Sequence, residues 1–294
     1  MFWEFLWEAL CEALIDTAKV TLFLFLSYLL MELFEHKVGD RSQNIIKKAG
    51  KLGPLVGGFL GGLPQCGFSA AAAGLYAGRI ISRGTLIAVF LATSDEMLPI
   101  MLSGLASQST SVPEIVLIIG TKVVCGIAVG FLIDVLFRKN KFERGHFEEI
   151  CEHEGCNCQN DGIWISSLKH TAKVALFLLL TTFAINLIVV YVGENNLGAI
   201  MHSVPVVGEL IAALVGLIPN CASSVVITEL YLGGTISASQ MLAGLFVGAG
   251  VGLLVLFRTN RSIVENLIIT AMLYVSGVAL GLLVGATGLF ETLV

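Results

Sequence analysis

The chain has 294 residues and a formal net charge of -5 at pH 7, with 56% hydrophobic and 13% charged residues. Together with a mean hydropathy of +0.88, this composition excludes an ordinary soluble domain and indicates an all-α protein that crosses the membrane several times. The sequence shows no basic patch for nucleic acid, and its N-terminus lacks the basic region of a removable signal peptide.

The first expected element is an amphipathic helix at the membrane interface. Glu4, Glu8, Glu12 and Asp16 recur every four residues, opposite large apolar side chains, which is the spacing of one helix face. This helix should lead into a first crossing near residues 17–36.

Three more apolar segments complete the first half, near 53–80, 84–105 and 113–137. Pro64, Gln65 and Cys66 interrupt the first of these. Proline removes a backbone donor and clashes with the preceding turn, so two half-helices are expected there. Broken helices at membrane depth are tolerated where they are buried in protein or line a cavity, and in transporters they point to the binding site.

The second half repeats the first. Pro219, Asn220 and Cys221 form a second break 155 positions after the first, and the sequence Thr-Ala-Lys-Val at 17–20 recurs at 171–174. Similarity at a fixed spacing indicates duplication. We expect an N-terminal transmembrane repeat, a linker and a C-terminal transmembrane repeat, over residues 1–137, 138–165 and 166–294.

The charges of the loops predict the direction of the repeats, because Lys and Arg favour cytoplasmic loops. Basic residues gather at 37–51, 79–83, 138–144 and 258–261, whereas loops 106–112, 193–208 and 232–239 have none. The two groups fall on opposite faces if each broken segment is a re-entrant hairpin. Each repeat then has three crossings plus a hairpin, the repeats are inverted, both termini are external and the linker is cytoplasmic. Four crossings in each of two parallel repeats is the less favoured alternative.

In the inverted arrangement the two hairpin tips meet near the middle of the bilayer. The half-helices that begin there present free backbone N–H groups and a positive dipole end, and the half-helices that end there present carbonyl groups. The backbone therefore leaves the sign of the ligand open. The expected substrate-binding residues at the tips are Gln65, Cys66, Ser69, Asn220, Cys221, Ser223 and Ser224.

Ionisable residues inside apolar segments are costly unless they are paired or hydrated. Asp95 and Glu96 lie midway along segment 84–105, where Pro99 should kink the helix and free carbonyl groups beside them. We expect both to bind the substrate, with Lys122 and Glu229 as counter-ion or coupling residues. The alternative for Asp95, Glu96 and Lys122 is a buried ion pair that only fixes helix register, and for Glu229 a solvated carboxylate.

The linker is the only sizeable polar segment. Its thiols and imidazoles offer enough ligands for a soft or borderline metal, and unpaired thiols fit a reducing cytoplasm. The alternative is an acidic tether with incidental cysteines. The candidate ligands in the linker are His146, Cys151, His153, Cys156 and Cys158.

The two Pro-polar-Cys breaks, the acidic segment from Thr93 to Pro99 and the Cys/His linker together resemble a bacterial and archaeal family of ten-helix heavy-metal exporters, whose members are called manganese transporters or arsenic efflux proteins. The resemblance covers nearly the whole chain. Five helices per repeat, counting each hairpin arm, agree with the family's ten. It implies metal or metalloid efflux from the cytoplasm of a prokaryote across its plasma membrane.

The candidate residues are compatible with three kinds of substrate. Mn²⁺ prefers oxygen ligands, which Asp95, Glu96, Gln65 and Asn220 offer. Trivalent arsenic is thiophilic and would bind Cys66 and Cys221. The alternative is a small oxyanion such as phosphate or arsenate, held by the half-helix N-termini with Lys122 as counter-charge.

Ion-coupled transport is the expected mechanism, since the sequence has no Walker-type loop. We expect alternating access driven by H⁺ or Na⁺, with no tightly bound cofactor, and the oligomeric state stays open. An enzyme is not expected, because the candidate bases lie at segment ends or in loops. These are His36, His146, His153, His170 and His202.

Overall fold

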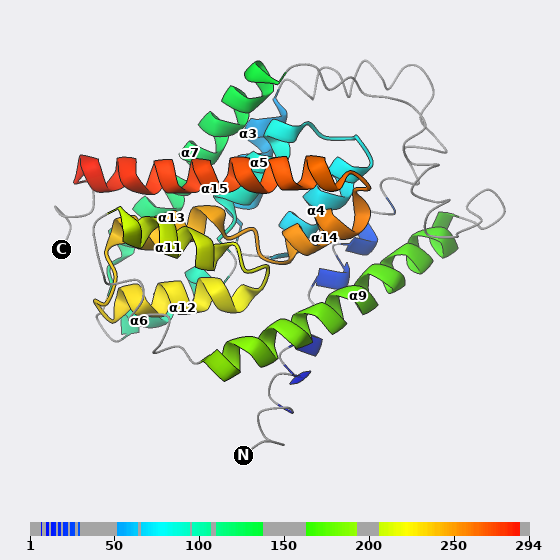
Figure 1. Cartoon of the computed structure of the whole chain (residues 1–294), viewed down its shortest axis with the longest axis horizontal. Coiled ribbons are helices and arrows are strands. Elements are labelled where there is room, and N and C mark those ends of the chain that lie inside the picture. The colour runs from blue at the N-terminus through cyan, green and yellow to red at the C-terminus, as the bar shows by residue number, and fades with distance from the viewer. Residues whose placement is uncertain are drawn as a thin grey trace.

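The computed structural model describes residues 52–63, 66–94, 96–106, 110–137, 163–192 and 206–288, together with scattered positions between 7 and 29. All regular structure in these parts of the chain is helical (Figure 1), which confirms the predicted all-α class. Four apolar stretches among them are long enough to cross a membrane, namely Arg83–Leu105, Val112–Leu136, Ala238–Thr259 and Ile263–Thr287.

The described helices keep the order expected for a duplicated chain. Those of the first half are α3 (Gly53–Gly61), α4 (Cys66–Ala77), α5 (Arg83–Ala92), α6 (Met97–Ala106) and α7 (Val112–Leu136). The others are α9 (Ile163–Val192), α11 (Val207–Gly216), α12 (Cys221–Leu232), α13 (Ala238–Val247), α14 (Val251–Thr259) and α15 (Ile263–Thr287).

The two halves pack their helices in the same way. In the first, α5 packs against α7 and α3, and in the second α13 packs against α15 and α11. Glycines at equivalent positions permit the close approach: a Cβ on Gly130 of α7 would lie 2.6 Å from the Gly84 carbonyl oxygen, and one on Gly281 of α15 would lie 2.9 Å from Ala243 Cα. Small residues at such contacts allow helix backbones to meet in a membrane.

In each half, two short helices flank the Pro-polar-Cys sequence, and the chain after them returns toward the start of the first one. In the second half, the start of α11 lies beside the start of α13, where Ser239 Oγ donates to Glu209 Oε1 at 2.8 Å. In the first half, Gly53 at the start of α3 lies against Thr85 near the start of α5. The chain therefore returns, after α4 and after α12, to the end from which α3 and α11 started.

The segment after each folded-back pair is also divided into two helices. The division in the first half lies at 93–96, between α5 and α6, and not at Pro99 as the sequence suggested. Pro99 lies in the first turn of α6, where a missing backbone N–H leaves no hydrogen bond unmade. In the second half α13 and α14 are separated by residues 248–250, with Gly250 at φ 51°, and the sequence analysis did not predict this break.

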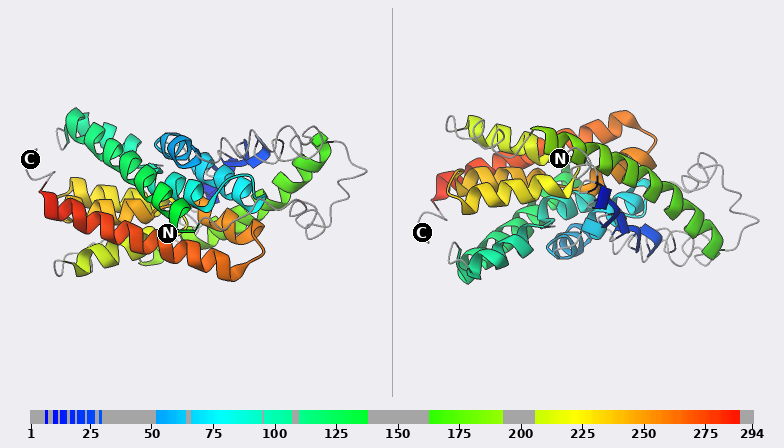
Figure 2. Two further views of the ribbon diagram at one scale, coloured as in Figure 1. Left: turned by 90° about the horizontal axis from the view of Figure 1, so that it is seen from above. Right: turned by 90° about the horizontal axis from the view of Figure 1, so that it is seen from below.

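The halves interlock through the short helices. Helix α4 packs along α14 of the other half, and α12 contacts α6 in the same way. Helices α7 and α15 lie on the outside: 28% and 22% of their apolar windows are buried, against 71% and 78% for the α5–α6 and α13–α14 stretches. The colour gradient in Figure 2 shows that α7 and α15 run in roughly opposite directions.

Candidate functional site

The structure describes part of the predicted site. Asn220, Cys221, Ser223 and Ser224 lie at the start of α12, and Ser69 lies in the first turn of α4. Gln65, Asp95 and the side chain of Cys66 lie outside the described residues. So do the linker residues His146, Cys151, His153, Cys156 and Cys158.

The start of α12 is buried and polar. Asn220 is 1% exposed, Cys221 4% and Ser223 6%. The Ser223 hydroxyl donates to the carbonyl oxygens of Asn220 (2.8 Å) and Ile218 (3.3 Å), and the Ser224 hydroxyl donates to that of Cys221 (2.8 Å). Because these hydroxyl protons bond to the backbone, the oxygen lone pairs are the part of each group left to face a ligand.

The breaks of the two halves lie against each other. Ser69, which is fully buried, packs where a Cβ on Gly252 would meet it at 2.8 Å. Gly252 belongs to the first turn of α14, so the start of α4 faces the 248–250 break. In the same manner α12 contacts α6, which begins directly after the break between α5 and α6. Glu96, the residue before α6, is half-buried. The fold thus gathers helix ends from both repeats in its interior.

Lys122 is fully buried in α7 and binds the end of α13. Its Nζ donates to the Leu245 carbonyl oxygen at 2.5 Å and lies 5.4 Å from the centroid of the Phe246 ring. The Leu245 carbonyl is left available because the Ala249 N–H bonds to Val247 instead. A cation at a helix C-terminus is favourable. Pairing of Lys122 with Asp95 stays a prediction, since Asp95 lies outside the described residues.

Glu229 lies near the end of α12 and is exposed, as its alternative interpretation as a solvated carboxylate requires. Among the residues that the structure describes, no three His, Cys, Asp or Glu side chains come close enough to hold a metal ion together. Among the described residues, Cys11, Cys125 and Cys221 form no disulfide bond. Cys221 places a sulfur atom at the start of α12, and sulfur is a ligand that soft ions prefer.

A group that we call the Glu114 cluster joins the halves at one end of the molecule. The Tyr231 hydroxyl at the end of α12 donates to Glu114 Oε1 at 2.5 Å. Glu114 Oε2 accepts from the Thr110 hydroxyl at 2.9 Å and from the Ser111 backbone N–H at 3.3 Å. Glu114 is 7% exposed, and each of its oxygens is hydrogen-bonded.

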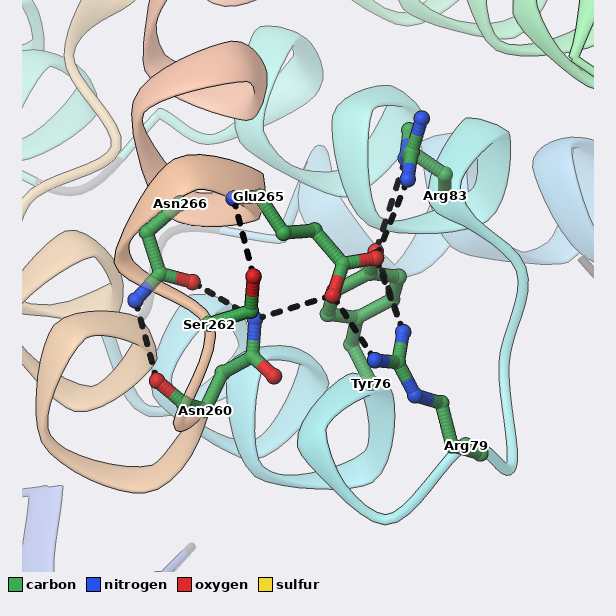
Figure 3. Close-up of polar contacts among 7 residues, drawn as sticks. All are labelled: Tyr76, Arg79, Arg83, Asn260, Ser262, Glu265 and Asn266. Carbon is green, nitrogen blue, oxygen red and sulfur yellow. Dashed lines mark hydrogen bonds and ion pairs between the residues drawn. The ribbon is translucent and has the colours of Figure 1, made fainter. Parts of the chain in front are cut away.

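The arginine cluster joins the halves through Tyr76, Arg79, Arg83 and Glu265 (Figure 3). Arg79 binds Glu265 with two nitrogens, at 2.8 and 2.7 Å, and Arg83 binds it at 3.0 Å. The Tyr76 hydroxyl also donates to Glu265 Oε1. The hydrogen bonds to Glu265 raise the pKa of Arg79, in the loop after α4, so this guanidinium remains charged.

The two clusters occupy equivalent places in the repeats. Tyr76 and Tyr231 are 155 positions apart, and Glu114 and Glu265 are 151 apart. Each Glu is the third residue after a Ser that precedes its helix, Ser111 or Ser262. The sequence analysis did not single out the two glutamates. The recurring Ser-x-x-Glu pattern, which is typical of a helix N-terminus, was the signal that could have found them.

Arg79 has a backbone conformation that side chains rarely adopt. Its φ is 58°, and Gly234, at the equivalent place in the second repeat, has φ 69°. A left-handed conformation costs a non-glycine residue roughly 1–2 kcal/mol. The two ion-pair hydrogen bonds to Glu265 offset this strain.

One family of known proteins matches the chain. The family model described as "Putative, 10TM heavy-metal exporter" matches residues 5–188, which is more than half of the 294 residues. The chain belongs to this family. The suspected resemblance is thereby confirmed, and with the apolar helices it identifies a polytopic membrane protein of a heavy-metal exporter family. No curated protein and no solved structure matches the chain.

Proposed function

We propose that this protein is a secondary active exporter of a metal or metalloid ion that works by alternating access around a site between the two hairpin tips. The observation that carries the proposal is the meeting of helix ends in the interior, where the start of α4 faces the α13–α14 break and α12 faces α6. Helix ends at membrane depth supply backbone carbonyls and N–H groups as ligands.

Several features support inverted repeats with re-entrant hairpins. The start of α3 lies beside the start of α5, and the start of α11 beside that of α13. The basic loops that carry Arg79 and Arg261 lie close together, because Arg79 binds Glu265. The roughly opposite directions of α7 and α15 (Figure 2) also support a second repeat that is inverted relative to the first.

A cation fits the described part of the site better than the alternative oxyanion does. At the start of α12 an anion would have only backbone N–H groups as donors from these residues, because Ser223 and Ser224 direct their hydroxyl protons to backbone carbonyls. The Lys122 ammonium, proposed as counter-charge for an anion, donates to the Leu245 carbonyl. The hydroxyl oxygens of Ser223 and Ser224 and the sulfur of Cys221 are ligand types that cations and metalloids bind.

The ligands at the two tips separate a hard from a soft substrate. Mn²⁺ would bind Asp95, Glu96 and backbone carbonyls, whereas arsenite would bind the thiols of Cys66 and Cys221. Alternating access also needs a closure at each end of the molecule. The Glu114 cluster and the arginine cluster lie where the two halves meet at those ends, and we infer that they are the two closures.

Uptake into everted membrane vesicles tests the function. Vesicles with the protein should accumulate Mn²⁺, Zn²⁺ or arsenite, but not phosphate or arsenate, and only with an imposed gradient of H⁺ or Na⁺. Vesicles without the protein are the control. Uptake of phosphate or arsenate would establish the oxyanion alternative, and gradient-independent flux would indicate a channel.

Two sets of variants then identify the ligands. If Asp95→Asn abolishes transport while the double variant Cys66→Ser and Cys221→Ser leaves it unchanged, the substrate is a hard cation. The reverse result identifies a thiophilic substrate. Deleting residues 146–158 tests the linker: unchanged dependence of transport on metal concentration would show that it is a tether.

A further inference from the structure

Glu209 is a buried carboxylate that the sequence analysis did not single out, and it lies beyond the residues that the family model matches. It lies in the first turn of α11 and is 7% exposed. Oε1 accepts a hydrogen bond from Ser239, whereas Oε2 is buried and has no hydrogen-bond partner among the described residues. A buried charge without partners is strongly unfavourable, and a carboxylate avoids this cost by taking up a proton.

The described helices packed against α11 carry no basic residue that offsets this charge. The helices packed against α11 are α12, α13 and α15. Their titratable groups are Cys221, Glu229 and Tyr231 on α12, and Glu265 and Tyr274 on α15; α13 has none. Tyr274 donates its hydroxyl to the Leu210 carbonyl oxygen at 3.1 Å. Residues 206–257 contain no Lys or Arg.

A pair of hydroxyls connects Glu209 to the surface. Ser239 Oγ, which binds Glu209, lies 2.9 Å from Ser237 Oγ. Ser237 is exposed and Ser239 half-buried. Hydroxyls that both donate and accept can pass a proton along such a path. The path opens at the loop before α13. This loop has no Lys or Arg and is therefore predicted to be external.

The first repeat has no equivalent of this arrangement. Pro54 stands at the position that corresponds to Glu209, so the duplicated fold does not need a carboxylate there. Glu114 gives a second contrast, because it is equally buried but has hydrogen bonds to both oxygens. Burial alone therefore does not explain the unpartnered oxygen of Glu209.

We propose that Glu209 is the site at which an external proton binds, and that this proton is the coupling ion exchanged for the exported metal or metalloid. The inference rests on the proposed function and deepens it by naming the coupling ion. After the proton leaves, the N-terminus of α11 favours the anionic carboxylate.

Proton entry conserves all atoms along the path. A proton binds the Ser237 oxygen, which passes its own hydroxyl proton to Ser239, and Ser239 passes its proton to Glu209 Oε1. Glu209 becomes a neutral carboxylic acid and both hydroxyls are regenerated. Release of the proton to the other side returns the carboxylate.

Infrared difference spectra of the full-length protein, recorded across a pH titration, test proton binding directly. The wild type should show the carbonyl-stretch band of a protonated carboxyl, and Glu209→Gln should lose it. Glu114→Gln is the matched control, because it removes an equally buried carboxylate and should keep the band. A band that persists in Glu209→Gln and disappears in Glu114→Gln would overturn the assignment.

Proteoliposomes with an internal pH dye test the coupling, with Mn²⁺ and arsenite as the probes. The wild type should move protons when either probe is transported. Glu209→Gln should lose this proton flux but still exchange labelled for unlabelled probe across the membrane. Ser239→Ala should slow proton uptake and keep the infrared band, which covers the case in which Glu209→Gln does not fold. Proton-coupled transport by Glu209→Gln at the wild-type rate would refute the proposal.

The failures of the two proposals are distinguishable. If the wild type transports neither probe under any gradient, the proposed function is wrong, and the infrared band still decides whether Glu209 binds a proton. If transport is found but depends on Na⁺ and not on pH, the exporter function stands and the role of Glu209 in coupling is refuted.

Discussion

The two ends of the molecule are built from the same pair of residues but carry different charge. At one end Tyr231 donates to Glu114, whose other donors are a hydroxyl and a backbone N–H. At the other end the equivalent Tyr76 donates to Glu265, which also binds two guanidinium groups. The same Tyr–Glu geometry thus occurs twice, and only one of the two pairs is joined by arginines.

The difference bears on the proposal that the two clusters are closures, because it predicts that they have unequal strength. Both carboxylates accept hydrogen bonds, but only Glu265 also pairs with two guanidinium charges, so the arginine cluster should hold its end shut more firmly than the Glu114 cluster does. A transporter that alternates between two states spends more time in the state with the stronger closure. Weakening the arginine cluster should therefore shift the population of states in one direction, and weakening the Glu114 cluster should shift it in the other.

The largest effect is expected from Glu265→Gln. The change leaves Arg79 and Arg83 without their carboxylate, and we expect a loss of about 2–4 kcal/mol in the free energy of unfolding, below the ~3–5 kcal/mol of a fully buried pair. The side chains keep 11–21% exposure, which accounts for the reduction. Unfolding by SDS in mixed micelles measures it. Glu114→Gln is the matched variant and should cost about 1 kcal/mol; equal losses would contradict the comparison.

Glycine substitutions test whether equivalent helix contacts inside the two repeats contribute equally to stability. Gly130→Ala and Gly281→Ala each force a Cβ against backbone atoms of the neighbouring helix, and each should cost about 1–3 kcal/mol by overpacking. The control is Gly120→Ala, where the Cβ meets open space and the helix gains about 0.5–1 kcal/mol. Thermal unfolding in detergent gives all three values. A loss in only one repeat would show that the interiors differ.

Substitution of Arg79 separates its backbone strain from its ion pair. Both Arg79→Ala and Arg79→Gly lose the bonds to Glu265, but only glycine adopts the φ of 58° without strain. The alanine variant should be less stable than the glycine variant by about 1 kcal/mol. The control pair is Gly234→Ala against wild type, where the same backbone cost should appear alone. Equal stability of the two Arg79 variants would show that the loop rearranges.

The smallest effects are expected from the tyrosines. Tyr231→Phe removes the only side-chain donor that reaches Glu114 from the other half among the described residues, at a cost of about 1 kcal/mol. Tyr76→Phe leaves Glu265 with both arginines and should cost less than about 0.5 kcal/mol. Amide hydrogen exchange should quicken in 232–237 for Tyr231→Phe, and stay unchanged in 78–82 for Tyr76→Phe. Faster exchange at both ends would mean that the arginines do not strengthen their closure.

Local sequence patterns predicted the elements well where one residue type decides the backbone. Pro219 predicted the division between α11 and α12, and the described ends of α3 and α4 flank Pro64. The predicted kink at Pro99 was wrong, because proline breaks a helix where a backbone hydrogen bond is lost, and the first turn of a helix has none to lose. The break at 248–250 went unpredicted, since glycines in an apolar run are equally compatible with close helix packing.

The sequence by itself determined the membrane class, the helix ends beside Pro64 and Pro219, and the family, because composition and proline chemistry act locally. Only the tertiary structure decided which residues meet. Glu265 reaches Arg79 across 186 positions and Tyr231 reaches Glu114 across 117, and Lys122 binds a carbonyl that a distant helix break sets free. Such partners depend on the packing of one repeat against the other, and no local pattern records which loops that packing brings together.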